Sequence, residues 1–141
     1  MNVRSSCLAV LALSTAVACK EESDPPNLPT LQGLTATCEF VERTWLLTQV
    51  EFVAQDADGV ADLEPPNVIV EDVVSLDAAD FDISPADDGQ SATYRWSYRP
   101  DGDAFYCGAE GDSPGTLLKL FVSIEDKAGF IAQLKVRSKP L

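Results

Sequence analysis

Histidine is absent from this sequence of 141 residues. Its absence excludes the Ser-His and Cys-His pairs of nucleophilic catalysis and every zinc site that uses histidine. The lysines fall in no motif of Ser-Lys catalysis. Carboxylates are so numerous that pairs suited to glycoside hydrolysis are easy to nominate and carry little information. The sequence therefore predicts a protein that is not an enzyme, and a hydrolase with paired carboxylates is only the third interpretation.

Basic residues are scarce, because ten Lys and Arg stand against 23 Asp and Glu, for a net charge of −13. Phosphate binding needs basic patches, so this balance argues against nucleic acid and anionic lipid headgroups as partners. The acidity itself is explained either by solubility or by a cationic ligand. Basic residues near the C-terminal end are expected to protect an exposed strand edge: Lys127, Lys135, Arg137 and Lys139.

No apolar run is long enough for a membrane-spanning helix, which needs about 20 residues. The most apolar stretch, CLAVLALSTAVA, covers only residues 7–18 and follows Arg4. This layout predicts a secretory signal peptide over residues 1–18. Ala16-Val17-Ala18 fits ordinary cleavage, but the same residues followed by Cys19 resemble the lipobox of bacterial lipoproteins, where the cysteine is lipidated.

The number of cysteines favours lipidation. Of four cysteines, three follow the predicted signal peptide: Cys19, Cys38 and Cys107. If Cys19 carries lipid, Cys38 and Cys107 can form a disulfide, whereas ordinary cleavage leaves an odd number in an oxidising compartment. We therefore expect a lipidated Cys19 followed by a polar, proline-rich tether over residues 19–31. Lys20, where an Asp would indicate inner-membrane retention, favours an outer-membrane location.

Residues 32–141 are expected to fold as one antiparallel β-sandwich of about seven strands. Apolar and polar residues alternate along several short stretches, which indicates strands with one buried face. The clearest pattern is a hairpin over residues 116–138, whose two arms are joined by a turn that contains Gly129. The other strands are expected at 34–41, 45–55, 67–74, 80–84 and 91–99.

Two stretches resemble bacterial immunoglobulin-like β-sandwich modules: VEFVAQDADGVADL at 50–63 and LFVSIEDKAGFIAQLKV at 120–136. Those modules often have a strand that ends in a D-x-D-G turn, and they close with a strand, an Asp-x-x-Gly turn and a last strand. The resemblance implies the architecture and no particular ligand. Antibody-type domains join their second and sixth strands by a disulfide, whereas Cys38 and Cys107 precede those strands here.

Asp56, Asp58 and Asp62 form the candidate metal site. Their spacing in DADGVAD resembles calcium loops of the EF-hand and thrombospondin-repeat kinds, in which alternate carboxylates converge on one ion. Ala54 and Pro65 occupy positions where an EF-hand loop has two further ligands, so the alternative is a solvated turn between strands. Other acidic residues are available to complete a site: Glu64, Asp126, Asp101, Asp103 and Asp112.

Phe105 and Tyr106, in the irregular segment 100–115, are a candidate binding loop. Aromatic side chains on a supported loop suit ligand contact, and packing over a bridge at Cys107 is the alternative. Together these features predict a non-catalytic, lipid-anchored interaction module at the cell surface or in the periplasm, whose protein or glycan partner the sequence does not identify. The alternative is a calcium-stabilised domain of the adhesion type.

Overall fold

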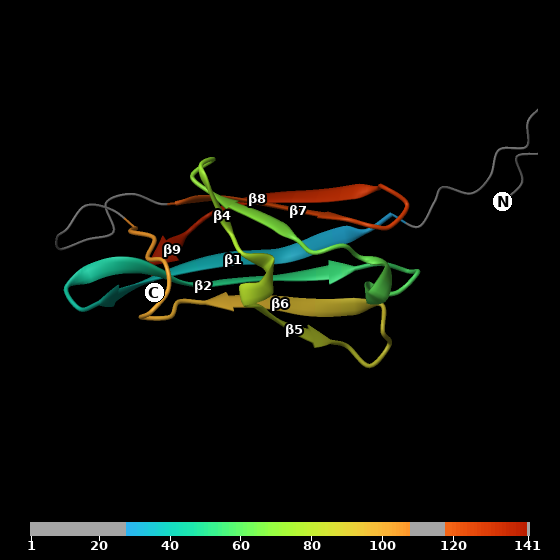
Figure 1. Cartoon of the computed structure of the whole chain (residues 1–141), viewed down its shortest axis with the longest axis horizontal. Helices are drawn as coiled ribbons and strands as arrows, with labels where there is room; N and C mark the ends of the chain where they lie inside the picture. The colour runs from blue at the N-terminus through green and yellow to red at the C-terminus, as the bar shows by residue number, and fades with distance from the viewer. Residues whose placement is uncertain (1–27, 108–117, 141) are drawn as a thin grey trace, which may run out of the picture.

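The computed structural model describes residues 28–107 and 118–140. Nine strands in this part of the chain form two sheets that pack face to face, as Figure 1 shows. The predicted all-β sandwich is confirmed, with nine strands in place of about seven. The predicted signal peptide, Cys19 and most of the predicted tether lie outside the described residues.

The larger sheet has the strand order β5-β6-β2-β1-β9. Its strands are β1 (Thr30–Val41), β2 (Thr44–Gln55), β5 (Phe81–Pro85), β6 (Ser91–Ser97) and β9 (Lys139–Pro140). Neighbouring strands are antiparallel except for β9, which pairs in parallel with β1. β1 begins at Thr30, slightly before residue 32, where the sequence predicts that the domain starts.

The smaller sheet is antiparallel and has the order β4-β3-β7-β8. Its strands are β3 (Asn67–Val70), β4 (Val74–Leu76), β7 (Lys119–Glu125) and β8 (Ile131–Arg137). The last two are the predicted hairpin. The single strand expected over 67–74 is instead a hairpin with a three-residue connection, 71–73, in which Glu71 and Asp72 take φ values of 54° and 59°, the left-handed conformation of a tight turn.

The core lies between the inward faces of the two sheets. Every second residue is buried there along the second half of β2 and along β7, and these residues are Val50, Phe52, Ala54, Leu120, Val122 and Ile124. Phe52 is at the centre, stacked on Tyr94 of β6 with ring centroids 5.0 Å apart. Such alternation is what the sequence predicts for half-buried strands, and burial of these apolar side chains holds the two sheets together.

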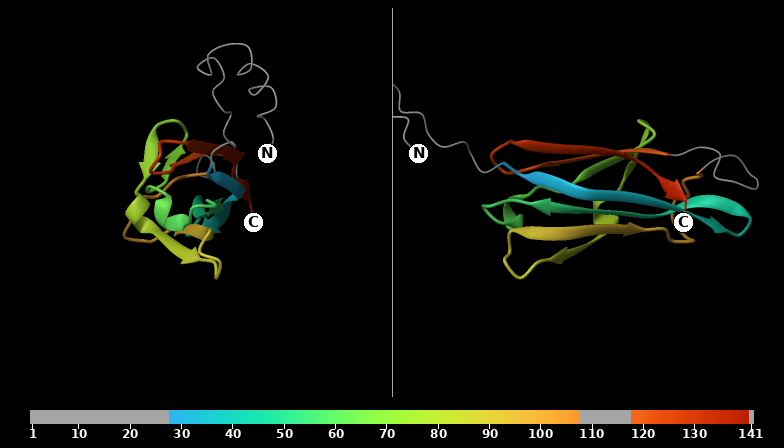
Figure 2. Two further views of the ribbon diagram at one scale, coloured as in Figure 1. Left: turned by 90° about the vertical axis from the view of Figure 1, so that its right-hand side faces the viewer. Right: turned by 180° about the vertical axis from the view of Figure 1, so that it is seen from behind.

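The two ends of the sandwich carry different segments (Figures 1 and 2). One end, here called the tether end, holds the start of β1, the segment 56–66 after β2, the β5–β6 connection and the β7–β8 turn. The opposite end, here called the far end, holds the β1–β2 turn and the segment 98–107 after β6.

The predicted disulfide is present between Cys38 of β1 and Cys107, with Cα atoms 6.2 Å apart. Both cysteines are buried. Backbone hydrogen bonds hold the same segment against β2, because Leu47 N–H donates to the Phe105 carbonyl and Cys107 N–H donates to the Trp45 carbonyl, each at 2.8 Å. The segment after β6 is therefore fastened to the larger sheet at the far end.

Removing this disulfide should lower the free energy of unfolding markedly. The bridge joins residues 69 positions apart, for which the chain-entropy model gives about 4 kcal/mol. We expect a loss of that order for Cys38→Ala/Cys107→Ala, measured by urea unfolding of the mature chain. Cys19→Ala is the matched control and should leave the unfolding free energy unchanged. Equal stability of the double variant and the wild type would show that the bridge does not constrain the unfolded chain.

Candidate metal centre

Two aspartates continue the inward-facing rows of the two central strands. Asp56 comes directly after β2, and Asp126 comes directly after β7. Because side chains alternate along a strand, both positions fall on the side that faces the core. Both aspartates are consequently buried, with exposed fractions of 0% and 2%. The pattern that builds the core thus places two carboxylates between the sheets at the tether end.

Both aspartates begin turns of the same Asp-x-x-Gly pattern. In each turn the Oδ1 atom accepts a hydrogen bond from the backbone N–H two residues later, Asp58 at 2.8 Å and Ala128 at 2.9 Å. Gly59 and Gly129 close the turns by donating to the aspartate carbonyls. Their φ values are 103° and 94°, a region that only glycine adopts without strain. Local sequence therefore fixes the position of each carboxylate.

A third carboxylate comes from Asp62, the last residue of the 3-10 turn η2 (Val60–Asp62). This segment is held beside the β7–β8 turn, because Lys127 N–H donates to the Asp62 carbonyl at 2.9 Å and Leu63 pairs with Asp126 in an isolated bridge. One carboxylate oxygen from each of Asp56, Asp62 and Asp126 lies within 4.8 Å of the others. No other such group occurs within residues 28–107 and 118–140.

None of these three carboxylates forms a salt bridge with a basic side chain in the described part of the chain. The ion pair found there joins Arg95 to Glu51, on the outward side of β6 and β2. The Oδ2 atom of Asp56 is buried and has no hydrogen-bond partner among the described residues. Burial of an unpaired carboxylate is costly, and buried charges are normally paired or bound to a metal ion. A cation between the three carboxylates would supply such a partner.

The pKa of Asp62 is raised above its usual value of 3.8. Desolvation is the largest cause, followed by the negative charges of Asp56, Asp126 and Asp58, while the positive charge of Lys127 acts in the opposite direction. A raised carboxyl pKa means that the ionised form is disfavoured in the folded protein. The neighbouring carboxylates thus repel one another when all of them are charged.

Calcium suits the donor atoms of this group. It is a hard cation that takes about six to eight oxygen ligands in flexible geometry, including carboxylates bound through one or two oxygens and water. Three aspartates supply only part of that number, so water or further oxygen atoms would complete the shell. Magnesium demands a tighter octahedral arrangement and usually retains several waters.

The structure brings together two of the three predicted ligands, Asp56 and Asp62, and adds Asp126. The carboxylate of Asp58 is not part of the group, although its charge contributes to the raised pKa of Asp62. Among the other acidic residues considered, Glu64 lies nearby, since its N–H donates to the Glu125 carbonyl. Asp101 and Asp103 lie at the far end, and Asp112 lies outside the described residues.

Phe105 and Tyr106 of the candidate binding loop are placed differently from each other. Phe105 is half-buried and packs edge-on against Trp96, with ring centroids 5.9 Å apart. Tyr106 lies opposite Leu46 in an isolated bridge, and its side chain is 58% exposed. Phe105 therefore extends the core at its edge, whereas Tyr106 faces solvent.

Comparison with known proteins gives no family model that matches this sequence and no curated protein that matches it. The described part of the chain contains no helix with the length and hydropathy of a membrane span.

Replacing Asp62 by Asn should stabilise the protein in calcium-free buffer, because it removes one charge from a repelling group. The raised pKa of Asp62 determines how this stabilisation changes with pH. The folded state holds the Asp62 proton more tightly than the unfolded chain, so this residue's contribution to stability falls as pH rises through its pKa. The melting-temperature advantage of Asp62→Asn over wild type should therefore grow as the pH rises from about 4, the pKa of an unperturbed Asp, toward neutral pH.

The control for this measurement is Asp82→Asn, an exposed position on β5 that lies outside the carboxylate group. It removes one negative charge elsewhere and should show a smaller effect in chelator-treated protein. An Asp62→Asn variant that is less stable than wild type throughout this pH range would contradict the repulsion.

Proposed function

We propose that this protein is a non-catalytic interaction module of the bacterial cell envelope, built on an immunoglobulin-like β-sandwich and stabilised by calcium. The single observation that supports the calcium part is the convergence of Asp56, Asp62 and Asp126 around a buried carboxylate oxygen without a hydrogen-bond partner in the described residues. Lipidation at Cys19 and an outer-membrane location remain predictions from the sequence.

The strand order supports the immunoglobulin-like assignment. Constant-type immunoglobulin domains have sheets ABED and CFG. If β1, β2 and β3 are A, B and C, the larger sheet contains the order A-B-E-D and the smaller sheet the order C-F-G, with β4 added beside β3 and β9 beside β1. The disulfide departs from the antibody pattern, because Cys38 lies on the first strand and Cys107 lies before β7.

A calcium ion at this position would connect the two sheets. Asp56 follows a strand of the larger sheet, Asp126 follows a strand of the smaller sheet, and Asp62 lies on the segment that runs between them. The three carboxylates repel one another when the ion is absent and are bridged when it is present. Calcium would therefore act as a clamp at one end of the sandwich, and the disulfide acts at the other.

The proposed calcium site lies at the end of the sandwich where the chain enters the domain. Thr30, the first residue of β1, pairs with Gln55, which directly precedes Asp56. If lipid on Cys19 anchors the chain, the calcium end of the domain faces the membrane through a short tether. The far end, with the disulfide-linked segment 98–107, is then presented to a protein or glycan partner.

Calcium should raise the melting temperature specifically. The weakest extracellular calcium modules have dissociation constants of about 1 mM. With that dissociation constant, about 10 mM calcium would add about 1.4 kcal/mol to the unfolding free energy. For a domain of this size that corresponds to a rise of about 6 °C. The measurement is thermal unfolding monitored by circular dichroism after removal of bound metal with a chelator.

Two controls separate binding from charge screening. Sodium and magnesium at matched ionic strength should give a smaller rise, because screening alone is not specific for calcium. Asp126→Asn should lose the calcium-specific rise, whereas Asp72→Asn, in the exposed β3–β4 turn, should retain it. Equal responses to all salts would leave only screening and would refute the site.

A further inference from the structure

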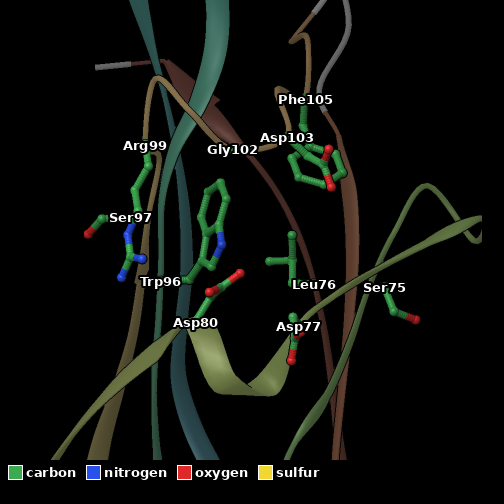
Figure 3. A pocket seen from close by; sticks show the side chains of 10 residues that line it. All are labelled: Ser75, Leu76, Asp77, Asp80, Trp96, Ser97, Arg99, Gly102, Asp103 and Phe105. Atoms are coloured by element: carbon green, nitrogen blue, oxygen red, sulfur yellow. The ribbon is translucent and has the colours of Figure 1, made fainter.

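A second site lies at the open edge of the sandwich, between β4 on one sheet and β6 on the other (Figure 3). It is a pocket of about 110 Å³ with an apolar floor formed by Leu76, Trp96 and Phe105. Its rim is polar and includes Asp80, Arg99 and Asp103. The carboxylate group at the tether end shares no residue with this pocket.

The walls of the pocket are held in place by interactions within the segments that form them. On one side, the segment 98–107 is fastened by the disulfide and by a hydrogen bond from Tyr98 N–H to the Thr48 carbonyl at 2.9 Å. On the other side, the side chain of Asp77 caps the 3-10 turn η3 (Ala78–Asp80) by accepting from Ala79 N–H at 2.9 Å. Such preorganisation reduces the entropy that a ligand would lose in ordering the site.

Four side chains of the pocket make no hydrogen bond or ion pair to another described side chain: Asp80, Trp96, Arg99 and Asp103. Trp96 is only 6% exposed, and its indole nitrogen faces the pocket in Figure 3 without making a hydrogen bond to any described residue. Asp80 and Asp103 place carboxylates beside the same space. Neither of them, nor Arg99, makes an ion pair within residues 28–107 and 118–140. Donors and acceptors therefore both remain available around an apolar floor.

This combination selects the class of ligand. A hydroxyl group both donates and accepts hydrogen bonds, so a hydroxyl-rich ring can satisfy the carboxylates and the indole N–H together. The C–H surface of such a ring can lie against the apolar floor. Ligand sites generally combine an apolar lining of this kind with a few placed polar groups. A simple cation would bind to the carboxylates but would offer no acceptor to the indole N–H or to Arg99. An anion would meet Asp77, Asp80 and Asp103.

We propose that this pocket binds a sugar unit of a glycan. The proposal does not depend on calcium, because the two sites share no residue. It assigns a role to the disulfide-linked segment, which supplies Phe105 to the floor and Arg99 and Asp103 to the rim. The pocket is small, so one sugar ring would enter it in part while the rest of the glycan remains in solvent.

Tryptophan fluorescence of the mature chain tests the proposal. The sequence has two tryptophans, so the Trp45→Phe variant reports on Trp96 alone. We expect glucose, galactose, mannose or N-acetylglucosamine to change its emission saturably. The expected dissociation constant is about 1 mM, a weak affinity that suits the few contacts of a single small ring. Asp80→Ala and Asp103→Ala should each weaken binding about tenfold, as expected for loss of a charge-assisted hydrogen bond.

Asp101→Ala is the matched control, because it removes a carboxylate from the same loop without altering the pocket lining. It should bind sugar like the parent variant, and circular dichroism should show that all variants remain folded. Saturable binding of butylammonium with no response to any sugar would identify a cation pocket and overturn the proposal. No saturable response to any of these sugars, or an unchanged response in Asp80→Ala and Asp103→Ala, would also overturn it.

Discussion

Packing of the inward faces of β2 and β7 is the interaction on which the rest of this structure depends. The second half of β2 and the whole of β7 bury every second side chain, and Phe52 is in the middle of the larger sheet's face with Tyr94 stacked on it. The neighbouring strands extend the same apolar layer on both sides. Burial of this layer supplies the main favourable free energy of folding and fixes which side chains point inward.

The carboxylate group is a direct result of that constraint. A one-residue shift of either strand would turn Asp56 or Asp126 outward, into water, where an isolated carboxylate costs nothing. The observed register instead continues the buried rows into these two aspartates. Apolar burial along both strands therefore offsets the cost of placing charges between the sheets, and a calcium ion would reduce that cost. Core and metal site share one periodic pattern.

Much of this arrangement was predictable from the sequence. Alternation gave the sandwich and the β7–β8 hairpin, and cysteine parity gave the pairing of Cys38 with Cys107. The split of residues 67–74 into two strands was missed, because Glu71 is an unusual residue for a left-handed turn position and no glycine marks the turn. Asp126 falls within the predicted hairpin, and its inward parity and its Asp-x-x-Gly pattern match those of Asp56.

The pocket at the far end was beyond sequence reasoning. Its floor and rim combine residues from β4, η3, β6 and the segment after it, and only the packing of the two sheets brings these together. Phe105 was identified as a binding candidate for its loop position, but its contact with Trp96 follows from the tertiary fold. Contacts between elements far apart in the chain leave no periodic signal in the sequence.

A crystal structure of the protein grown with calcium tests the central claim most directly. Data collected at long wavelength would locate calcium by its anomalous scattering. The account predicts one anomalous peak at about 2.3–2.6 Å from carboxylate oxygens of Asp56, Asp62 and Asp126. A structure without a peak there, in which a water molecule or a protonated carboxyl satisfies the Oδ2 atom of Asp56, would contradict it.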